Sequence, residues 1–324
     1  MKKYDVFGIG SALMDILVEV DEKQLLEFDL KKGEMRLVDE SQAVQILDKI
    51  SHLKPKLAPG GSAANVLAGI ANMGGNVVFC GKVGRDEHGL IYEQKMIDGN
   101  VNPRISKADR ITGNAITFIT PDFERTFATH LGAALLLEKE DVFEEELKAS
   151  KFLHIEGYQL EGNLKNTALH AMELAKKNDV KISIDLADAG LIERNLKDLQ
   201  EIVKKYAHIT FANEKEAKAF TGKEPEKAAK EISEIVEIAV VKIGERGSLV
   251  MSGEKFIKVN AYSAKAIDTT GAGDMYAAGF LYGLCCGKPL ELCGKIGSYA
   301  AARIVEQLGG RLDYSIKGEI GGIK

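Results

Sequence analysis

A glycine-rich turn with an aspartate directly behind it stands near the C-terminal end of the chain, in "DTTGAGDMYAAGFLYG" (residues 268–283). Gly271, Ala272 and Gly273 precede small and apolar residues at helical spacing, so several backbone N–H groups should converge at the start of a buried helix. Such a helix start is a ready site for an anion. The stretch lacks the G-K-[ST] of a Walker A loop and the glycine spacing of a Rossmann fingerprint. Taken alone, Asp274 is either a helix cap or a catalytic base.

A second glycine cluster, "PGGSAANVLAGIANMGG" (residues 59–75), opens another segment of helical pattern. Gly60 and Gly61 would let backbone amides approach a ligand closely. The Asn65 side chain could then offer a donor and an acceptor to a polyol or a base. The plainer interpretation makes Ser62 a helix N-cap after a simple glycine turn.

The third cluster, "VVKIGERGSLV" (residues 240–250), follows an apolar run with Lys242 at its end. In a parallel sheet, ligands bind at the carboxyl ends of the strands. The turn with Gly244 and Gly247 could therefore follow the phosphates of a nucleotide, or it could be an ordinary β-hairpin turn.

Short, almost continuously apolar runs recur along the chain and are typical of strands buried on both faces of a parallel sheet. They cover residues 4–10, 77–84, 152–158, 181–186, 208–213 and 238–244. Helical patterns lie between them, at residues 62–73, 164–177, 196–206, 215–221 and 226–235. This alternation predicts a doubly wound α/β fold.

Two stretches break this alternation, because their extended patterns and turn signals are not followed by a long helix. They predict a lid built from two insertions, at about residues 15–40 and 99–131, that pair as a small antiparallel sheet. A lid is useful where water must be kept from a reaction. A pair of surface hairpins is the alternative.

Composition limits the partners of this chain of 324 residues, which has a formal net charge of -5 and 45% hydrophobic residues. Lysines alternate with acidic residues, so nucleic acid is not an expected partner. No apolar stretch approaches the roughly 20 residues that span a bilayer, and no secretory signal pattern precedes the first strand. We expect a cytoplasmic protein with no membrane partner, and four cysteines are too few for a disulfide scaffold.

The motifs together resemble the ribokinase-like (pfkB) family of sugar and nucleoside kinases. "PGGSAANVLAGIANMGGNVVFCGKVGRDEHG" resembles the N-terminal signature of that family, "DTTGAGD" the C-terminal one, and "NEKE" its N-x-x-E motif. The similarity covers the whole chain and is closest to bacterial adenosine kinase-like members. It implies a single ribokinase-like domain over residues 1–324, with a mostly parallel central sheet flanked by helices and a small β-sheet lid.

The resemblance also implies ATP-dependent phosphorylation of a primary hydroxyl group. Asp274 would accept the hydroxyl proton, and the amides of residues 271–274 would hold the phosphoryl oxygens. The helix dipole should stabilise ionised Asp274, making it a weak base that takes the proton late. Lys242, Gly244 and Gly247 would follow the nucleotide.

Metal ions are implied at two places. Asn213, also expected beside the nucleotide, and Glu216 would organise Mg²⁺ through water. Without the resemblance, Asn213 would be a helix cap and Glu216 its capping-box partner. Asp268 and Thr270 match positions at which some members bind a monovalent cation such as K⁺.

On the acceptor side, the resemblance implies that Asp15 accepts hydrogen bonds from two sugar hydroxyls. Gly61 and Asn65 would complete this sugar site. The same residues serve the ribose of a nucleoside and free sugars such as fructose or ribose.

The first lid segment is similar in spacing to the start of adenosine kinases, and "TPDFERTFATHLGAA" resembles the lid segment of adenosine kinase-like bacterial proteins. The resemblance therefore favours a nucleoside. Arg125 in that stretch matches an arginine that reaches the transferring phosphates in adenosine kinases. Two residues depart from the pattern of animal adenosine kinases where purine contacts are expected: Ser11 stands where they have an asparagine, and Met35 stands where they have a polar lid residue. Tyr158 could stack on a purine. Adenosine, inosine and guanosine stay open, as do a sugar acceptor and the choice between monomer and homodimer.

Overall fold

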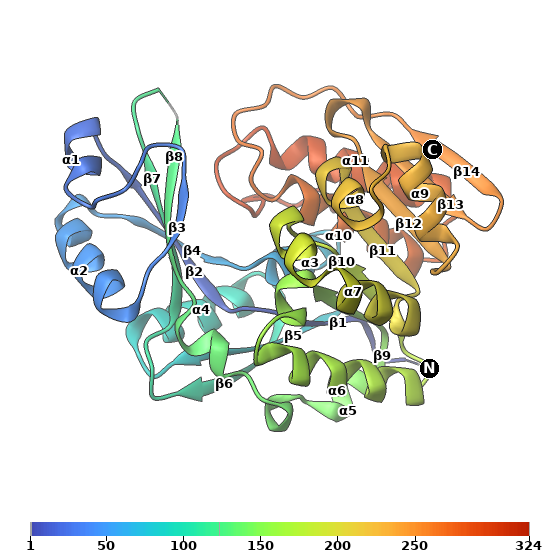
Figure 1. Ribbon diagram of the computed structural model, residues 1–324, viewed down its shortest axis with the longest axis horizontal. Helices are drawn as coiled ribbons and strands as arrows, with labels where there is room; N and C mark the ends of the chain where they lie inside the picture. Colours follow the sequence, from blue (N-terminus) through green and yellow to red (C-terminus); the bar gives the residue numbers. More distant parts are fainter. Residues whose placement is uncertain (1, 123, 324) are drawn as a thin grey trace.

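Two β-sheets organise the chain (Figure 1). The computed structural model describes residues 2–122 and 124–323, without the side chain of Met35. The strand order of the large sheet is β14-β13-β12-β11-β10-β9-β1-β5-β6. Its strands are β1 (Tyr4–Ile9), β5 (Val77–Gly84), β6 (Asn102–Ala108), β9 (Ser150–Glu156), β10 (Lys181–Asp185), β11 (Ile209–Asn213), β12 (Ile238–Lys242), β13 (Ser248–Ser252) and β14 (Lys255–Val259).

All neighbours from β6 to β12 are parallel, and β13 and β14 complete one edge in antiparallel pairing. Apolar runs buried on both faces explain this arrangement, because helices cover each face. The predicted doubly wound α/β fold is confirmed.

Helices pack on both faces of the large sheet and form two apolar cores. One face carries α3 (Ser62–Asn72), α4 (Glu87–Asp98), α10 (Ala272–Cys285), α11 (Leu290–Ile304) and α12 (Lys317–Ile320). The other carries α5 (Glu144–Lys148), α6 (Leu164–Lys177), α7 (Ala189–Tyr206), α8 (Glu214–Thr221) and α9 (Pro225–Ser233). The predicted helix at 196–206 is too short, because the Asp188 side chain caps α7 earlier and the helix continues across a kink at Asn195.

Glycines let α3, α10 and α11 approach one another closely. A Cβ on Gly69 would lie 2.7 Å from Cβ of Ala278, and one on Gly279 would lie 2.7 Å from Cα of Gly297. Larger residues at these positions would push the helices apart. The first turns of α3 and α10 therefore lie side by side, and both carry polar residues of the glycine motifs.

The small sheet has the order β3-β8-β7-β2-β4. Its strands are β2 (Leu13–Glu19), β3 (Met35–Leu37), β4 (Lys56–Gly60), β7 (Gly113–Ile119) and β8 (Arg125–His130). The short helices α1 (Glu22–Leu26) and α2 (Glu40–Ile50) lie beside it (Figure 1), and Ile46 of α2 shares a core with Ile16 and Ile116. Asp15 alternates with Ile16 along β2, so it lies on the opposite face of the sheet.

The small sheet differs from the predicted lid in three ways. Its pairing is mixed, because β2 with β7 and β3 with β8 are parallel. Residues 56–60, outside both predicted segments, supply β4. Residues 102–108, inside the second segment, pair with β5 in the large sheet, as a βαβ crossover through α4 favours. That this sheet closes over a ligand stays a prediction.

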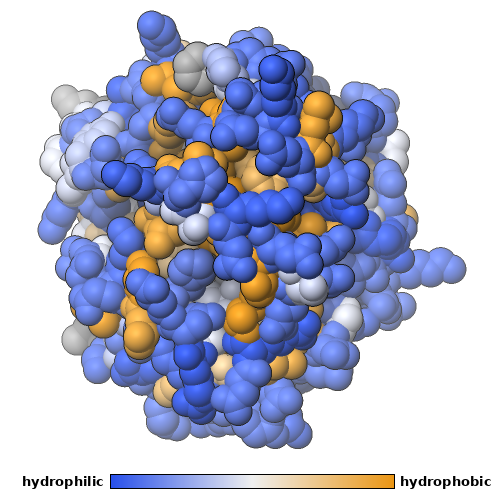
Figure 2. Space-filling view, turned by 90° about the vertical axis from the view of Figure 1, so that its left-hand side faces the viewer, coloured by the Kyte–Doolittle hydropathy of each residue, from blue (hydrophilic) through white to orange (hydrophobic). Residues whose placement is uncertain are grey.

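Figure 2 shows the side of the molecule on which the small sheet lies, where a mostly hydrophilic surface surrounds hydrophobic side chains near the middle. Leu26 of α1, Leu37 of β3 and Val44 of α2 are exposed apolar residues on this side. Among residues 2–122 and 124–323, no helix is both long enough and apolar enough to cross a membrane.

Candidate active site

Polar residues end four neighbouring strands of the large sheet. Glu156 of β9 is in register with Asp185 of β10, and Asn213 of β11 with Lys242 of β12. Carboxyl ends of parallel strands share one edge of the sheet, so these side chains gather there. A cleft of about 1040 Å³ opens at this edge, and Asp185, Asn213, Lys242 and Asp274 all line it.

The glycine-rich turn behind the cleft begins α10. Gly271 is the N-cap with φ 76°, and a Cβ there would lie 2.7 Å from Cα of Gly310, so glycine is required. The Ala272 N–H donates to the Thr269 carbonyl at 3.2 Å, whereas the next amides of a first helical turn have no partner within the helix. Lys242 Nζ lies 3.1 Å from the position of a Cβ on Gly273. The positive end of α10 and a lysine therefore meet at one point.

Lys242 forms an ion pair with Asp185 at 2.8 Å, and both side chains are largely buried. Sequence reasoning did not single out Asp185, because the end of its strand carries no recognisable motif. The pair holds the lysine at the mouth of the glycine-rich turn.

Asp274, in the first turn of α10, connects its own glycine motif to the motif at the start of α3. Its Oδ1 accepts a hydrogen bond from Ser62 Oγ at 2.8 Å and its Oδ2 one from Asn65 Nδ2 at 3.1 Å. Burial raises the pKa of Asp274, and this outweighs the hydrogen bonds from Asn65 and Ser62, which lower it. The shift is opposite to the expected effect of the helix dipole, because desolvation of the carboxylate is the larger cause.

Asp15 faces the same region from the small sheet. Burial raises the pKa of Asp15 to about 7, while the Arg311 guanidinium lowers it and the charge of Asp274 raises it further. A Cβ on Gly60 would collide with the Asp15 carboxylate, so this glycine makes room for it. Arg311 Nε donates to Asn65 Oδ1 at 3.1 Å. Arg311, which sequence reasoning missed, thus connects the Asn65 motif to the chain's C-terminal segment.

Ser62 is not the N-cap of α3. The N-cap is Gly61, whose φ is 94° and whose Cβ, if present, would collide with the Ser11 carbonyl. The Ser62 hydroxyl turns to Asp274 instead, and Glu156 Oε2 accepts the Ala63 N–H at 2.9 Å. A carboxylate from another strand therefore satisfies the helix start, which local sequence could not indicate.

Arg125 connects the small sheet to the glycine-rich turn. Its guanidinium forms an ion pair with Asp268 at 2.8 Å and donates to Thr270 Oγ1 at 2.9 Å. Asp268 also accepts the N–H groups of Thr270 at 2.9 Å and Gly309 at 2.7 Å. A guanidinium lies where a monovalent cation was expected, and the K⁺ site stays a prediction.

Asn213 and Glu216 form the capping box that local sequence predicts. Glu216 N–H donates to Asn213 Oδ1 at 2.9 Å, and Asn213 N–H donates to Glu216 Oε2 at 2.7 Å. Burial raises the pKa of Glu216 to about 7, and the nearby charge of Asp185 raises it further. Glu216 and the neighbouring Asp185 offer carboxylate oxygens, the ligands that Mg²⁺ prefers, and Lys242 lies beside both. The oxygen donors suit this ion, while among the described residues no group of three or more His, Cys, Asp or Glu side chains is placed to hold a metal by itself.

The remaining predicted residues border the same region. Gly244 and Gly247 lie in the hairpin turn between β12 and β13 and line the cleft, so the hairpin interpretation holds, and contact with a nucleotide stays a prediction. Tyr158 is 47% exposed and lines the cleft too. Ser11 Oγ accepts a hydrogen bond from Gln159 at 2.9 Å. Met35 begins β3, and its side chain lies outside the described part of the structure.

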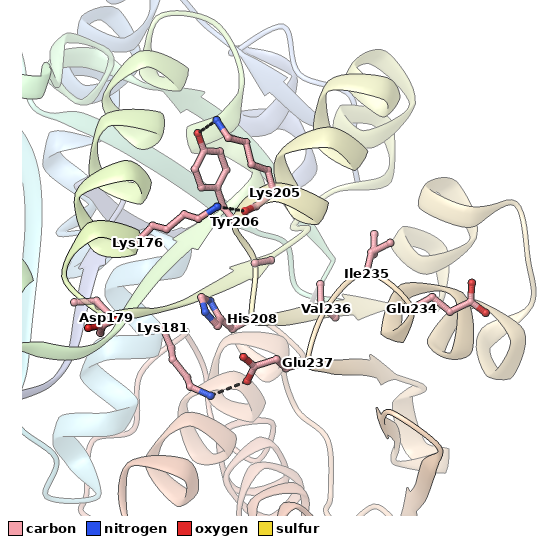
Figure 3. Close-up of a pocket in the computed structure, with 12 residues that line it drawn as sticks. Lys176, Asp179, Lys181, Lys205, Tyr206, His208, Glu234, Ile235, Val236 and Glu237 are labelled. Carbon is pink, nitrogen blue, oxygen red and sulfur yellow. Dashed lines mark hydrogen bonds and ion pairs between the residues drawn. The ribbon is translucent and has the colours of Figure 1, made fainter.

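A second hollow, of about 560 Å³, lies at the opposite, amino-terminal ends of β10–β12 (Figure 3). Lys181 pairs with Glu237 at 2.7 Å, Lys176 Nζ donates to a backbone carbonyl, and Lys205 Nζ donates to the Tyr206 hydroxyl. These lysines already interact with protein groups, so this hollow is a poorer phosphate site than the cleft at the carboxyl edge.

The profile of the pfkB family carbohydrate kinases matches residues 38–317. The chain belongs to this family. The resemblance inferred from the motifs is confirmed, and this pfkB protein is a kinase with a hydroxyl group as acceptor.

Relatives of this pfkB kinase carry two kinds of name. A 5-dehydro-2-deoxygluconokinase of Listeria monocytogenes is 33% identical over 263 residues, which cover 76% of this chain and 81% of the relative. The structure of adenosine kinase from Sinorhizobium meliloti is 33% identical, with a TM-score of 0.88 and 98% of both chains covered. A probable sugar kinase from Rhizobium etli is 31% identical, with a TM-score of 0.89 and 99% and 98% covered. Similarity alone thus leaves sugars and nucleosides open.

Proposed function

We propose that this pfkB kinase transfers the γ-phosphoryl group of ATP to the 5′-hydroxyl of a nucleoside, with adenosine preferred. The position of Asp274 carries the proposal of phosphoryl transfer, and the 33% identity to an adenosine kinase over 98% of both chains supports the nucleoside acceptor. The Asp274 carboxylate is bound by Ser62 and Asn65 of one glycine motif while it stands in the first turn of the other. A base that joins the acceptor side to an anion-binding helix start is what in-line transfer needs.

The chemistry assigns a role to each side of Asp274. The acceptor hydroxyl approaches from the side of Asp15, Gly61 and Asn65, and Asp274 takes its proton as the new oxygen–phosphorus bond forms. Because burial raises the pKa of Asp274, it is a stronger base than an exposed aspartate. Ser11, Met35 and Tyr158 are the candidate neighbours of the purine ring of the acceptor, and the Tyr158 ring is suited to stacking on it.

Positive charge meets the phosphoryl group from three directions. The amides of residues 271–274 and Lys242 supply two of them at the start of α10. Arg125 of the small sheet supplies the third from beside Asp268 and Thr270. As a closing lid, that sheet would also exclude water, which strengthens each of these interactions.

The nucleotide fits the cleft lined by Asn213, Lys242, Gly244 and Gly247. Asn213 and Glu216 would hold Mg²⁺, in part through water. When bound, the ion neutralises phosphate charge. The cytoplasmic location and the choice between monomer and homodimer stay predictions.

A sugar acceptor is the second candidate. The 33% identity to a 5-dehydro-2-deoxygluconokinase over 76% of the chain favours it. Asp15 and Asn65 suit the hydroxyls of either acceptor.

Steady-state phosphorylation of adenosine, inosine, guanosine, ribose and fructose separates the candidates. We expect adenosine to have the highest kcat/KM. Asp274→Asn should lower kcat by at least about 10²-fold, the usual scale for a positioned proton acceptor. Asp109→Asn, at a side chain that is 92% exposed, is the control and should match the parent protein. Turnover of a sugar with no turnover of any nucleoside would refute the nucleoside assignment.

A further inference from the structure

A second buried carboxylate, Glu156, lies beside Asp274 and has no role in the chemistry above. It ends β9 and is 1% exposed. Its carboxylate accepts the Ala63 N–H at 2.9 Å and the Ser11 backbone N–H, and the Ser62 hydroxyl, whose hydrogen is donated to Asp274, is its side-chain partner. Burying an ionisable group at this depth is costly, and these hydrogen bonds offset part of that cost.

Ser62 joins the two carboxylates. Its Oγ lies 2.8 Å from Asp274 Oδ1, and the same hydroxyl is a hydrogen-bond partner of Glu156. A hydroxyl both donates and accepts, so it can receive a proton on one side while giving its own on the other. The order Asp274, Ser62, Glu156 is therefore a continuous hydrogen-bonded chain.

Burial raises the pKa of Glu156 to about 7, and the charge of Asp274 raises it further. The other titratable groups near it are Asp185, in register on β10 and ion-paired with Lys242, and the neutral tyrosines Tyr158 after β9 and Tyr92 of α4. Near neutral pH Glu156 can therefore exist in both protonation states.

We propose that Ser62 and Glu156 form a proton relay behind Asp274. The relay rests on the proposed kinase function. As the acceptor oxygen bonds to the γ-phosphorus and the bond to the bridging oxygen breaks, the hydroxyl proton passes to Asp274. The protonated Asp274 donates to Ser62 Oγ while Ser62 passes its own proton to Glu156. Asp274 is ionised again, and Glu156 is neutral and holds the proton that the reaction releases.

Such a relay solves a problem of closed sites. A proton left on Asp274 would have to leave through the space that the phosphorylated product fills. Transfer to Glu156 holds it on the side of α3, away from the phosphoryl group, while the product is bound. Once the product has left, the proton returns through Ser62 to Asp274, which lines the cleft, and passes from there to water, so both carboxylates are ionised again for the next turnover.

Kinetics of four variants test the relay: Glu156→Gln, Ser62→Ala, Ser62→Thr and the double variant Ser62→Ala/Glu156→Gln. We expect the first two to lower kcat about 10-fold, with both KM values within about threefold of the parent. The double variant should be no slower than the slower single variant, because the groups act in series. Ser62→Thr keeps the hydroxyl and should restore most of the rate. Glu161→Gln, a partly exposed neighbour bound to Arg194, is the matched control.

The pH profile tests the electrostatic coupling between Glu156 and Asp274, which the relay requires. In Glu156→Gln the acid limb of kcat should move to lower pH, because Asp274 loses a negative neighbour. If Glu156 only caps α3, the variant raises KM or loses stability while the acid limb stays in place, and the relay is wrong. If the parent protein turns over and Glu156→Gln has the same kcat and pH profile as the parent, the relay is wrong and the kinase function stands. A parent protein that phosphorylates no acceptor refutes the function and the relay together.

A readout without turnover completes the test. Infrared difference spectra of the free protein should show a carboxyl group that titrates near neutral pH, is absent in Glu156→Gln, and titrates at lower pH in Asp274→Asn. A Glu156 carboxyl that stays ionised from pH 5 to 8, or that is insensitive to Asp274→Asn, would overturn the proposal.

Discussion

Replacing Asp15 with asparagine should stabilise the free protein at pH 8 and leave it almost unchanged at pH 5. Burial raises the pKa of Asp15 from 3.8 to about 7. Between these values the unfolded chain carries an ionised Asp15 while the folded protein binds a proton. The stability that this group contributes at low pH is therefore lost as pH rises through 7.

The size of the effect follows from the two pKa values. Integrating proton binding from pH 5 to pH 8 with pKa values of 3.8 and about 7 gives a loss on the order of 2 to 3 kcal/mol in the free energy of unfolding. The amide side chain introduced by Asp15→Asn cannot ionise and avoids this loss. Its shape matches the neutral carboxylic acid, so at pH 5 the two proteins should be nearly equal.

Urea unfolding of the parent and of Asp15→Asn at pH 5, 6, 7 and 8 measures the difference directly. The variant's advantage should grow with pH across this range, whereas Asp109→Asn at an exposed side chain should show no such growth. A difference between parent and Asp15→Asn that stays constant within about 0.5 kcal/mol would refute the reasoning, since burial would then not control this carboxyl.

The same carboxylate makes acceptor binding depend on pH. If ionised Asp15 accepts the acceptor hydroxyls, its ionised fraction rises about tenfold between pH 6 and pH 8, and affinity rises with it. Calorimetry with the best acceptor and no ATP should show this rise in the parent, and weaker, pH-independent binding in Asp15→Asn. Equal affinity for the two proteins would contradict the role of Asp15.

Three further changes probe how the site is held. Arg125→Ala removes the link from the small sheet to the glycine-rich turn, and should lower kcat at least about 10-fold while acceptor affinity by calorimetry changes less than threefold; a larger loss of affinity than of kcat would contradict this. Gly69→Ala inserts a Cβ where only 2.7 Å is open, and should cost about 1 to 3 kcal/mol in urea unfolding, whereas Gly318→Ala meets no neighbour within 4 Å and should cost far less. The double variant Lys242→Met/Asp185→Asn replaces both charges of the buried ion pair with neutral side chains, so the protein should still fold. Its KM for ATP should be at least about 10-fold higher than that of the parent. An unchanged KM for ATP would show that Lys242 does not contact the phosphates.

Much of the fold follows from local patterns. Continuous apolar runs predicted the parallel strands, and helical spacing predicted α6 at its observed bounds, 164–177. The capping box of Asn213 and Glu216 was also predicted from the sequence, because its two residues lie one helical turn apart. The small sheet was harder, because residues 56–60 form an edge strand whose partner, β2, lies far away in the sequence.

The sequence by itself determined the family, the parallel α/β architecture and the glycine motifs, because these depend on residue types at short, regular spacing. Only the tertiary structure decided which side chains meet at Asp274. Glu156 reaches the start of α3 across 93 residues, and Arg311 reaches Asn65 across 246. Neither has a local pattern, since a lone glutamate or arginine has the same appearance in a surface loop and in a core. Burial then sets their chemistry, because desolvation raises the pKa of a carboxyl only after the chain has packed around it.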